Sequence, residues 1–189
     1  MTATALVVID VQESFRHAPY WSDKDLPAYI AKQQALIDGC AAIGVPIVQI
    51  FHVDGDAAFS LQSGFVRSFD GLKIQPDVTF HKTFHSAFAG TPLAAWLTAR
   101  GIGRLIVSGI RTEQCCETTT RQASDSGFKV DYVTEATLTF PMTHAGSGRT
   151  YSAQEIKERT ELVLAGRFAT IATVDQALSR AGAHALNAA

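Results

Sequence analysis

Three residues of reactive types follow segments that read as buried strands. Asp10 comes directly after the apolar run ALVVI, Lys82 ends a short strand-like segment, and Cys115 lies in a turn between a strand and a helix. A thiol becomes a nucleophile when a neighbouring base takes its proton, and a nearby cation favours both a thiolate and an ionised carboxylate. Together in one crevice, these three side chains would form the reactive group of a cysteine hydrolase.

Cys115 is followed directly by Cys116, although the chain holds only three cysteines. We expect a helix over about 114–126 with Thr112 as its N-cap, so that Cys115 lies in the first turn. There the helix start would lower the pKa of the thiol and leave its backbone N–H free to bind an oxyanion. Cys116 would point about 100° further round the helix and pack against the sheet, as Cys40 would pack in an earlier helix.

Strand-like and helix-like segments alternate along the chain. Strands are expected at 5–9, 45–51, 77–82, 104–109 and 128–134, and helices at 26–44, 91–101 and 152–168, with a short strand and a helix over 169–182. This order predicts βαβ units with right-handed crossovers, and therefore a single-domain three-layer α/β/α sandwich of Rossmann-like topology over residues 1–189. Ligands of such sheets bind at the carboxyl ends of the strands, where the three reactive residues lie.

Details of sequence refine this outline. Thr91 is the expected N-cap of its helix, and Ser152 with Glu155 forms a capping-box pattern. The segment 137–150 is long for a strand-to-helix connection, so we interpret it as a lid or an oligomer contact. We expect a homo-oligomer, either a dimer or a tetramer.

Composition excludes several classes of function. The net charge of −2 gives no electrostatic basis for binding nucleic acid or an anionic membrane. The first apolar run ends at Asp10, which is too short for a signal peptide or a membrane span. An odd number of cysteines without regular spacing argues for a reducing compartment, so we predict a cytoplasmic protein with a small-molecule substrate.

Each reactive residue also has an ordinary structural explanation. An aspartate after a strand is commonly a turn former, a lysine is commonly a solvated charge, and a free cysteine is commonly a buried apolar residue. Residue types and spacing alone therefore leave a hydrolase and a binding domain both open. A thiol-redox domain with a Cys115–Cys116 disulfide is also open, although it leaves Asp10 and Lys82 unexplained.

Three stretches resemble the isochorismatase-like cysteine hydrolases, a family that includes nicotinamidases and N-carbamoylsarcosine amidases. ALVVIDVQESF resembles the strand with the catalytic aspartate, HKTFHSAFAG the lysine segment, and GIRTEQCCETTT the nucleophile turn. The turn pattern Gly-x-x-Thr-x-x-Cys-x-x-x-Thr falls on Gly109, Thr112, Cys115 and Thr119, and Cys116 stands where the family usually has valine. The resemblance covers nearly the whole chain and implies a triad of Asp10, Lys82 and Cys115.

The resemblance also implies a mechanism. A cis peptide would join Ile110 to Arg111, and the backbone N–H groups of Arg111 and Cys115 would form the oxyanion hole. The implied reaction is hydrolysis of an amide, ureide or carbamoyl C–N bond through a thioester. Asp10 would act as the proton carrier, and Lys82 would hold Asp10 and the thiolate in their charged forms.

One part of the family pattern is missing. Nicotinamidases typically carry Asp-x-His after the second strand and a further histidine, which bind a metal, whereas this chain has His52 and Asp54 in the reverse order. His81 and His85 do not form a helical zinc pair. We therefore predict no metal and no cofactor, and keep nicotinamidase activity as an alternative. Isochorismatase activity is a second alternative, disfavoured because those enzymes lack the cysteine.

Aromatic and polar residues near the strand ends complete the predicted site. Phe15, Phe51 and Phe84 are expected to form walls of the substrate pocket. His52 is expected to line the pocket or to be hydrogen-bonded in place, and Thr112 is assigned to the substrate side of the nucleophile turn.

Overall fold

The computed structural model describes residues 3–55 and 57–186 and contains a six-stranded parallel sheet. The strands of this sheet are β1 (Ala3–Ile9), β2 (Ile47–His52), β3 (Val78–Lys82), β4 (Ile102–Ile110), β5 (Lys129–Leu138) and β8 (Thr170–Ile171). The helices are α1 (Leu26–Ala42), α2 (Leu93–Thr98), α3 (Glu117–Asp125), α4 (Ala153–Leu164) and α5 (Val174–Leu186). The strand order β3-β2-β1-β4-β5-β8 reverses direction at β1, where parallel sheets open a ligand crevice.

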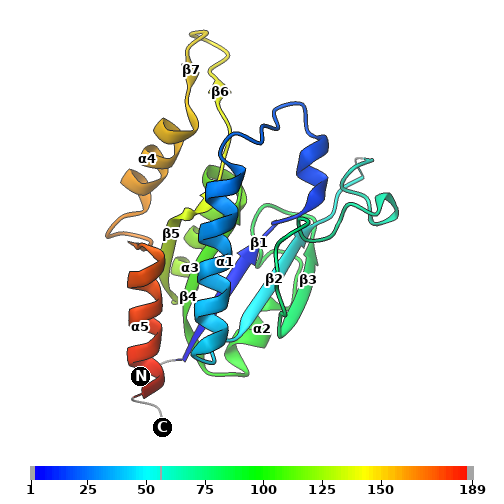
Figure 1. The fold of residues 1–189 in the computed structure, drawn as a ribbon. Helices are drawn as coiled ribbons and strands as arrows, with labels where there is room; N and C mark the ends of the chain where they lie inside the picture. Colours follow the sequence, from blue (N-terminus) through cyan, green and yellow to red (C-terminus); the bar gives the residue numbers. More distant parts are fainter. Residues whose placement is uncertain (1–2, 56, 187–189) are drawn as a thin grey trace.

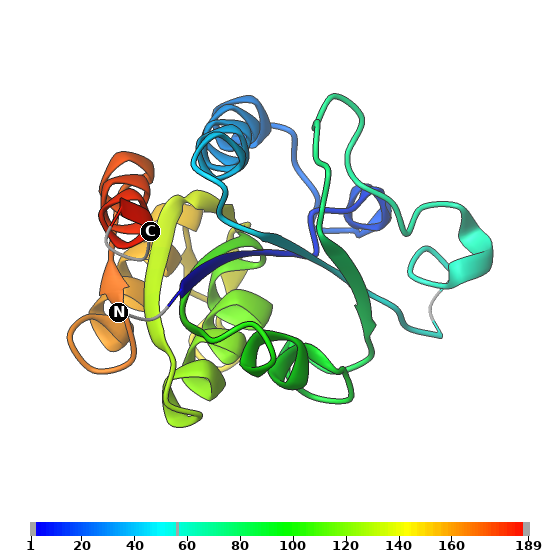
Figure 2. The same cartoon turned by 90° about the horizontal axis from the view of Figure 1, so that it is seen from below.

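Helices cover both faces of the sheet, with α1 and α5 on one side and α2 and α3 on the other (Figures 1 and 2). Successive side chains of a strand point to opposite faces, so Leu6 and Val8 of β1 pack under α1 and α5, while Ala5, Val7 and Ile9 pack under α2 and α3. All five are fully buried. The predicted three-layer α/β/α sandwich is thereby confirmed.

Two helix starts test the capping predictions. Ser152 and Glu155 form the expected capping box at α4, each side chain bonding to the other's backbone. The N-cap of α2 is Pro92, one residue after the predicted Thr91. The Thr91 hydroxyl nevertheless accepts a hydrogen bond from the backbone N–H of Leu93 at the start of the helix, at 3.3 Å, and donates one to the carbonyl of Ala87.

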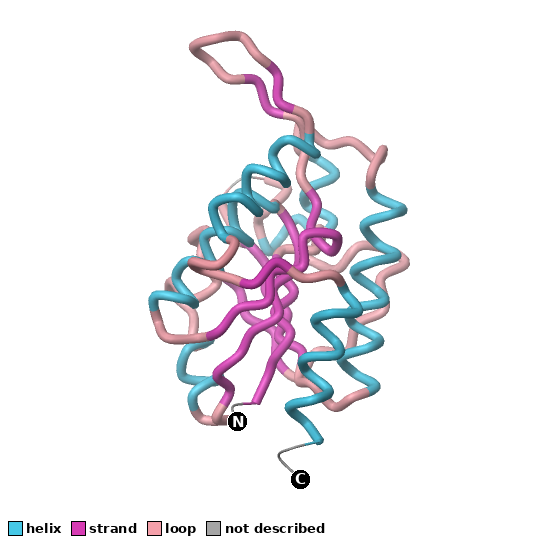
Figure 3. Tube along the Cα trace, turned by 90° about the vertical axis from the view of Figure 1, so that its left-hand side faces the viewer, coloured by secondary structure: helices cyan, strands magenta, loops and turns pink. Residues whose placement is uncertain are grey.

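A short hairpin interrupts the connection between β5 and α4. Its strands, β6 (Met142–Thr143) and β7 (Thr150–Tyr151), pair with each other and stand off the body of the molecule (Figures 1 and 3). Residues 141–150 are exposed throughout. Polar residues with glycines at 146 and 148 gave no strand signal here, so the hairpin was not predicted. Among the described helices, none is long and apolar enough to cross a membrane.

Candidate active site

The carboxyl ends of three strands bring Asp10, Lys82 and Cys115 together. The Lys82 ammonium lies 2.7 Å from Oδ2 of Asp10 and 3.4 Å from Sγ of Cys115. Because β2 separates β3 from β1, the long lysine side chain is needed to reach the aspartate. Asp10, Lys82 and Cys115 are 0%, 1% and 6% exposed, so the predicted cluster exists and is almost closed to water.

The close approach of β4 to β1 shapes the turn that carries Asp10. Asp10 has a left-handed backbone with φ 53°, which aspartate tolerates better than most residues. Gly109 lies beside Ile9 in the sheet register, has φ 128°, and would place a Cβ 2.0 Å from the Ile9 carbonyl oxygen. Only glycine fits there, and it lets the strand that leads to Cys115 run against the strand that leads to Asp10.

The nucleophile turn differs from the expected N-capped α-helix. Residues Thr112–Cys116 form one π-helical turn before α3, and their N-cap is Arg111 without a side-chain cap bond. The Thr112 hydroxyl donates to Thr137 at 2.8 Å, and the Thr112 carbonyl accepts from the Tyr132 hydroxyl at 2.7 Å. Thr112 is fully buried, and it fixes the turn against β5 instead of capping α3.

The cis peptide implied by the resemblance is present between Ile110 and Arg111. The side chain of Arg111 turns away from open solvent, forming an ion pair of 2.9 Å with Glu113 and lying 4.6 Å from the centre of the Tyr20 ring. The backbone of Arg111 leads directly into the turn that carries Cys115. Cys116 is fully buried among apolar residues, as expected from its place on the helix, and so is Cys40.

Burial dominates the electrostatics of the cluster. It raises the pKa of Asp10, an effect that the Lys82 ammonium opposes. Burial acts to lower the pKa of Lys82, but Asp10 and Cys115 together outweigh it and the net pKa is raised. Burial and the Asp10 charge together raise the pKa of the Cys115 thiol. The expectation of a lowered thiol pKa was therefore wrong, because the carboxylate and the loss of water outweigh Lys82.

Two histidines flank the cluster. Nδ1 of His52 lies 3.2 Å from the Lys82 ammonium, and Nδ1 of His85 lies 3.8 Å from Sγ of Cys115. The two imidazole rings are nearly parallel, at 7°, with centroids 6.5 Å apart. Sequence analysis left the role of His85 undecided, and its only signal was its place three residues after Lys82.

The three phenylalanines predicted to line the substrate pocket lie in different surroundings. Phe15 packs edge-on against Phe59 at 5.1 Å, and Phe59 in turn contacts His52 with ring centroids 5.9 Å apart. Phe84 is 60% exposed and so is free to contact a ligand. Phe51 alternates with His52 along β2 and therefore points to the opposite face of the sheet, away from Lys82.

Gln12 is a site residue that sequence analysis missed. It is fully buried two residues after Asp10, and its amide group forms two hydrogen bonds with the backbone of His52, at 2.8 Å and 3.0 Å. Its one signal in the sequence was its place two residues after Asp10. Gln12 ties the end of β2 to the turn that carries Asp10.

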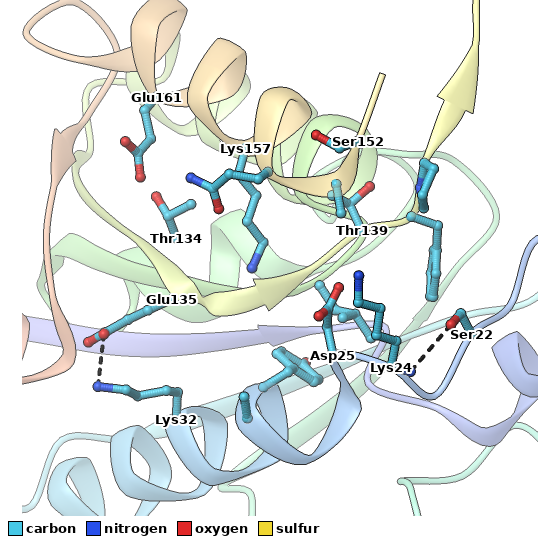
Figure 4. A pocket seen from close by; sticks show the side chains of 17 residues that line it. Ser22, Lys24, Asp25, Lys32, Thr134, Glu135, Thr139, Ser152, Lys157 and Glu161 are labelled. Carbon is cyan, nitrogen blue, oxygen red and sulfur yellow. Dashed lines mark hydrogen bonds and ion pairs between the residues drawn. The ribbon is translucent and has the colours of Figure 1, made fainter. Parts of the chain in front are cut away.

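The cavity in Figure 4 lies away from this cluster. It measures about 660 Å³, is enclosed by α1, the end of β5 and α4, and contains none of the three reactive residues. Its lining carries equal numbers of acidic and basic side chains, and the Lys157 ammonium extends into it (Figure 4). Among the described residues, no group of three or more His, Cys, Asp or Glu side chains is arranged to hold a metal ion.

Comparison with known proteins decides the family. Residues 4–176 match the family model described as the isochorismatase domain. The chain belongs to the isochorismatase family. The resemblance carried by the three sequence motifs is thereby confirmed, and the protein is a hydrolase of this family.

The chain is similar to proteins whose names give different functions. Nicotinamidase 3 of Arabidopsis thaliana is 30% identical over 188 residues, covering 91% of this chain and 85% of the relative. Ureidoacrylate amidohydrolase RutB of Caulobacter vibrioides is 42% identical over 64 residues, covering 33% of this chain and 27% of the relative. A cysteine hydrolase of Pseudomonas syringae pv. phaseolicola is similar in structure, with a TM-score of 0.86, 25% identity, and coverage of 95% of this chain and 92% of that one.

Proposed function

We propose that this protein is a cysteine hydrolase that cleaves the C–N bond of a small amide, ureide or carbamoyl compound through a thioester. The observation that carries the proposal is the buried contact of Lys82 with both Asp10 and Cys115. Supporting it, a solved relative is named a cysteine hydrolase and a curated relative is named an amidohydrolase. The proposed reaction gives each of the three residues of the cluster a role.

Acylation begins with a neutral thiol. Because burial and the Asp10 charge raise the thiol pKa, the resting cluster is a carboxylate, an ammonium and a thiol. Asp10 takes the proton as Cys115 attacks the carbonyl carbon of the substrate. The backbone N–H groups of Arg111 and Cys115 stabilise the oxyanion, and Asp10 returns the proton to the leaving nitrogen as the C–N bond breaks.

Deacylation repeats the proton transfers with water. Asp10 takes a proton from a water molecule, which attacks the thioester carbonyl. The tetrahedral intermediate then expels the Cys115 sulfur, which recovers its proton from Asp10 and releases the acid product. Lys82 contributes by keeping Asp10 ionised against the cost of burial.

A nicotinamidase-type activity is the second candidate, favoured by the 30% identity to Nicotinamidase 3. The two candidates differ in their substrate and in their dependence on metal. Nicotinamide belongs in the same substrate panel, assayed before and after exhaustive chelation. Hydrolysis of nicotinamide that is lost on chelation and restored by zinc or iron would favour this second candidate over the proposed one.

The proposed function is tested with a panel of small amides, ureides and carbamoyl compounds, read by ammonia release. The wild-type protein should hydrolyse at least one class, and Cys115→Ser should abolish that hydrolysis. The matched control is Cys116→Val, which alters a buried apolar neighbour and should leave most of the activity. Full activity in Cys115→Ser would overturn the proposal.

A further inference from the structure

The Lys82 ammonium has a complete set of partners. A lysine ammonium carries three N–H donors and no acceptor. Oδ2 of Asp10 lies 2.7 Å from Nζ, Nδ1 of His52 lies 3.2 Å away, and Sγ of Cys115 lies 3.4 Å away. The contact with Asp10 is an ion pair, whereas His52 and Cys115 lie in hydrogen-bonding geometry. Asp10 and Cys115 both belong to the proposed reaction. The remaining partner, His52, takes part in no step of the proposed reaction.

The contact with Lys82 fixes the protonation of His52. A nitrogen that faces an ammonium must accept a hydrogen bond, so Nδ1 is unprotonated and the proton of the neutral ring sits on Nε2. Nε2 lies 3.9 Å from Oδ2 of Asp54. Burial and the Lys82 charge lower the pKa of His52, while Asp10 and Asp54 act to raise it and His85 to lower it. The net effect is a lowered pKa, so the imidazole of His52 is neutral at neutral pH.

The backbone around His52 holds this arrangement in place. His52 ends β2 and pairs in register with Lys82 at the end of β3, so both side chains leave the same face of the sheet. The buried amide of Gln12 forms hydrogen bonds with both the N–H and the carbonyl of His52. Gln12 follows Asp10 by two residues, which links the imidazole to the turn that carries the base.

We infer that His52 is a positioning residue for the reaction: its neutral Nδ1 accepts the third N–H of Lys82 and holds the ammonium against Asp10 and Cys115. This inference rests on the proposed function and assigns His52 a role other than lining the substrate pocket. Without the Nδ1 acceptor, that N–H can hydrogen-bond only to water, and the ammonium is no longer held in one orientation. His52 therefore acts on turnover through Lys82, and substrate affinity depends little on it.

Two substitutions test the hydrogen-bond acceptor of His52 separately from its imidazole ring. In His52→Asn the amide oxygen can occupy the place of Nδ1, whereas in His52→Gln the amide reaches the place of Nε2 and leaves Lys82 without its third acceptor. Both remove the imidazole, so any contact of the ring with substrate is lost equally. We expect His52→Asn to keep kcat within about threefold and His52→Gln to lose roughly 10²-fold, the scale for a displaced reacting group, with KM little changed in both.

Two measurements need no substrate. Alkylation of Cys115 by iodoacetamide should be slower in His52→Gln than in the wild type and nearly normal in His52→Asn, because a loosened ammonium favours the thiolate less. In the intact wild-type protein, the ¹⁵N chemical shifts of His52 should show the Nε2–H tautomer at neutral pH. This spectrum tests the inference even where a variant fails to fold.

Three results would overturn the inference: equal losses of kcat in the two variants, an effect confined to KM with alkylation unchanged, or an Nδ1–H tautomer in the wild type. Failure of the proposed function has a different signature. If Cys115→Ser hydrolyses the substrate normally, the cysteine mechanism is wrong, whatever the tautomer of His52.

Discussion

The Cys115 thiol is held next to the group that must deprotonate it. Burial raises the pKa of Asp10, and the Lys82 ammonium opposes that rise and so favours the ionised carboxylate. The same carboxylate disfavours a second negative charge on Cys115, so the pair carries one proton between its two members. That proton is the one that moves in the proposed reaction.

Replacing Asp10 with asparagine removes the base and keeps the shape. Turnover of an accepted amide should fall by roughly 10²–10⁴-fold, the range for losing a positioned acid–base group. In the wild type, kcat/KM should fall as the pH drops through the pKa of Asp10. Since burial raises that pKa, this acid limb should lie above 3.8, the ordinary value. Near-native turnover in Asp10→Asn would remove Asp10 from the mechanism.

The three cysteines should differ in reactivity. Cys115 is 6% exposed, whereas Cys40 and Cys116 have no exposed surface, and burial raises the pKa of Cys40 to about 12. Iodoacetamide followed by peptide mass spectrometry should therefore label Cys115 first. Because the pKa of Cys115 is also raised, the labelling rate should keep climbing as the pH increases above neutral. If Cys116 were labelled before Cys115, the assignment of Cys115 as the reactive cysteine would be wrong.

At the scale of elements, a single glycine sets the spacing between the two strands that carry the acid and the thiol. Gly109→Ala forces a Cβ to within 2.0 Å of the Ile9 carbonyl, at a φ of 128°. The matched control is Gly101→Ala, with φ 62° and no atom within 4 Å of the new Cβ. In urea unfolding we expect the control to lose about 1–2 kcal/mol, the cost of a left-handed alanine, and Gly109→Ala to lose more. Equal losses would contradict the steric argument.

Strand positions were predictable where apolar runs are continuous, as in β1 and β4. The nucleophile turn was harder to predict, because Thr112 reads as an N-cap while its hydroxyl is used by Thr137, far along the chain. The contact of His52 with Lys82 was also hidden from sequence, since it depends on the pairing of β2 with β3. Local signals could not show either of these long-range hydrogen bonds.

On the scale of the whole molecule, the β6–β7 hairpin and α4 form a face that no other described part of the chain covers. A cavity of about 740 Å³ lies between them, with acidic and basic side chains beside exposed apolar ones. Met142 is 41% exposed and Leu162 is 80% exposed. A hairpin with strands of two residues is not stable alone in water, so we expect a second copy of the chain to cover this self-complementary face.

Light scattering after size exclusion tests this expectation. The wild type should be a dimer or a tetramer, and Leu162→Glu should shift it toward the monomer by placing a charge in the apolar part of the contact. The control is Leu61→Glu, at a residue 58% exposed in the short 3-10 helix Leu61–Ser63, outside this face, which should leave the assembly unchanged. A monomeric wild type at high concentration would contradict the expectation.

The central claim is that Cys115 forms a thioester with the acyl part of a C–N substrate. The most direct measurement is acid quenching during turnover, followed by peptide mass spectrometry of the protein. The account predicts that the peptide containing Cys115 gains the mass of the acyl group, that Cys115→Ser shows no such thioester, and that hydroxylamine removes the adduct. Substrate turnover with no adduct on Cys115, or with an adduct on Cys116, would contradict it.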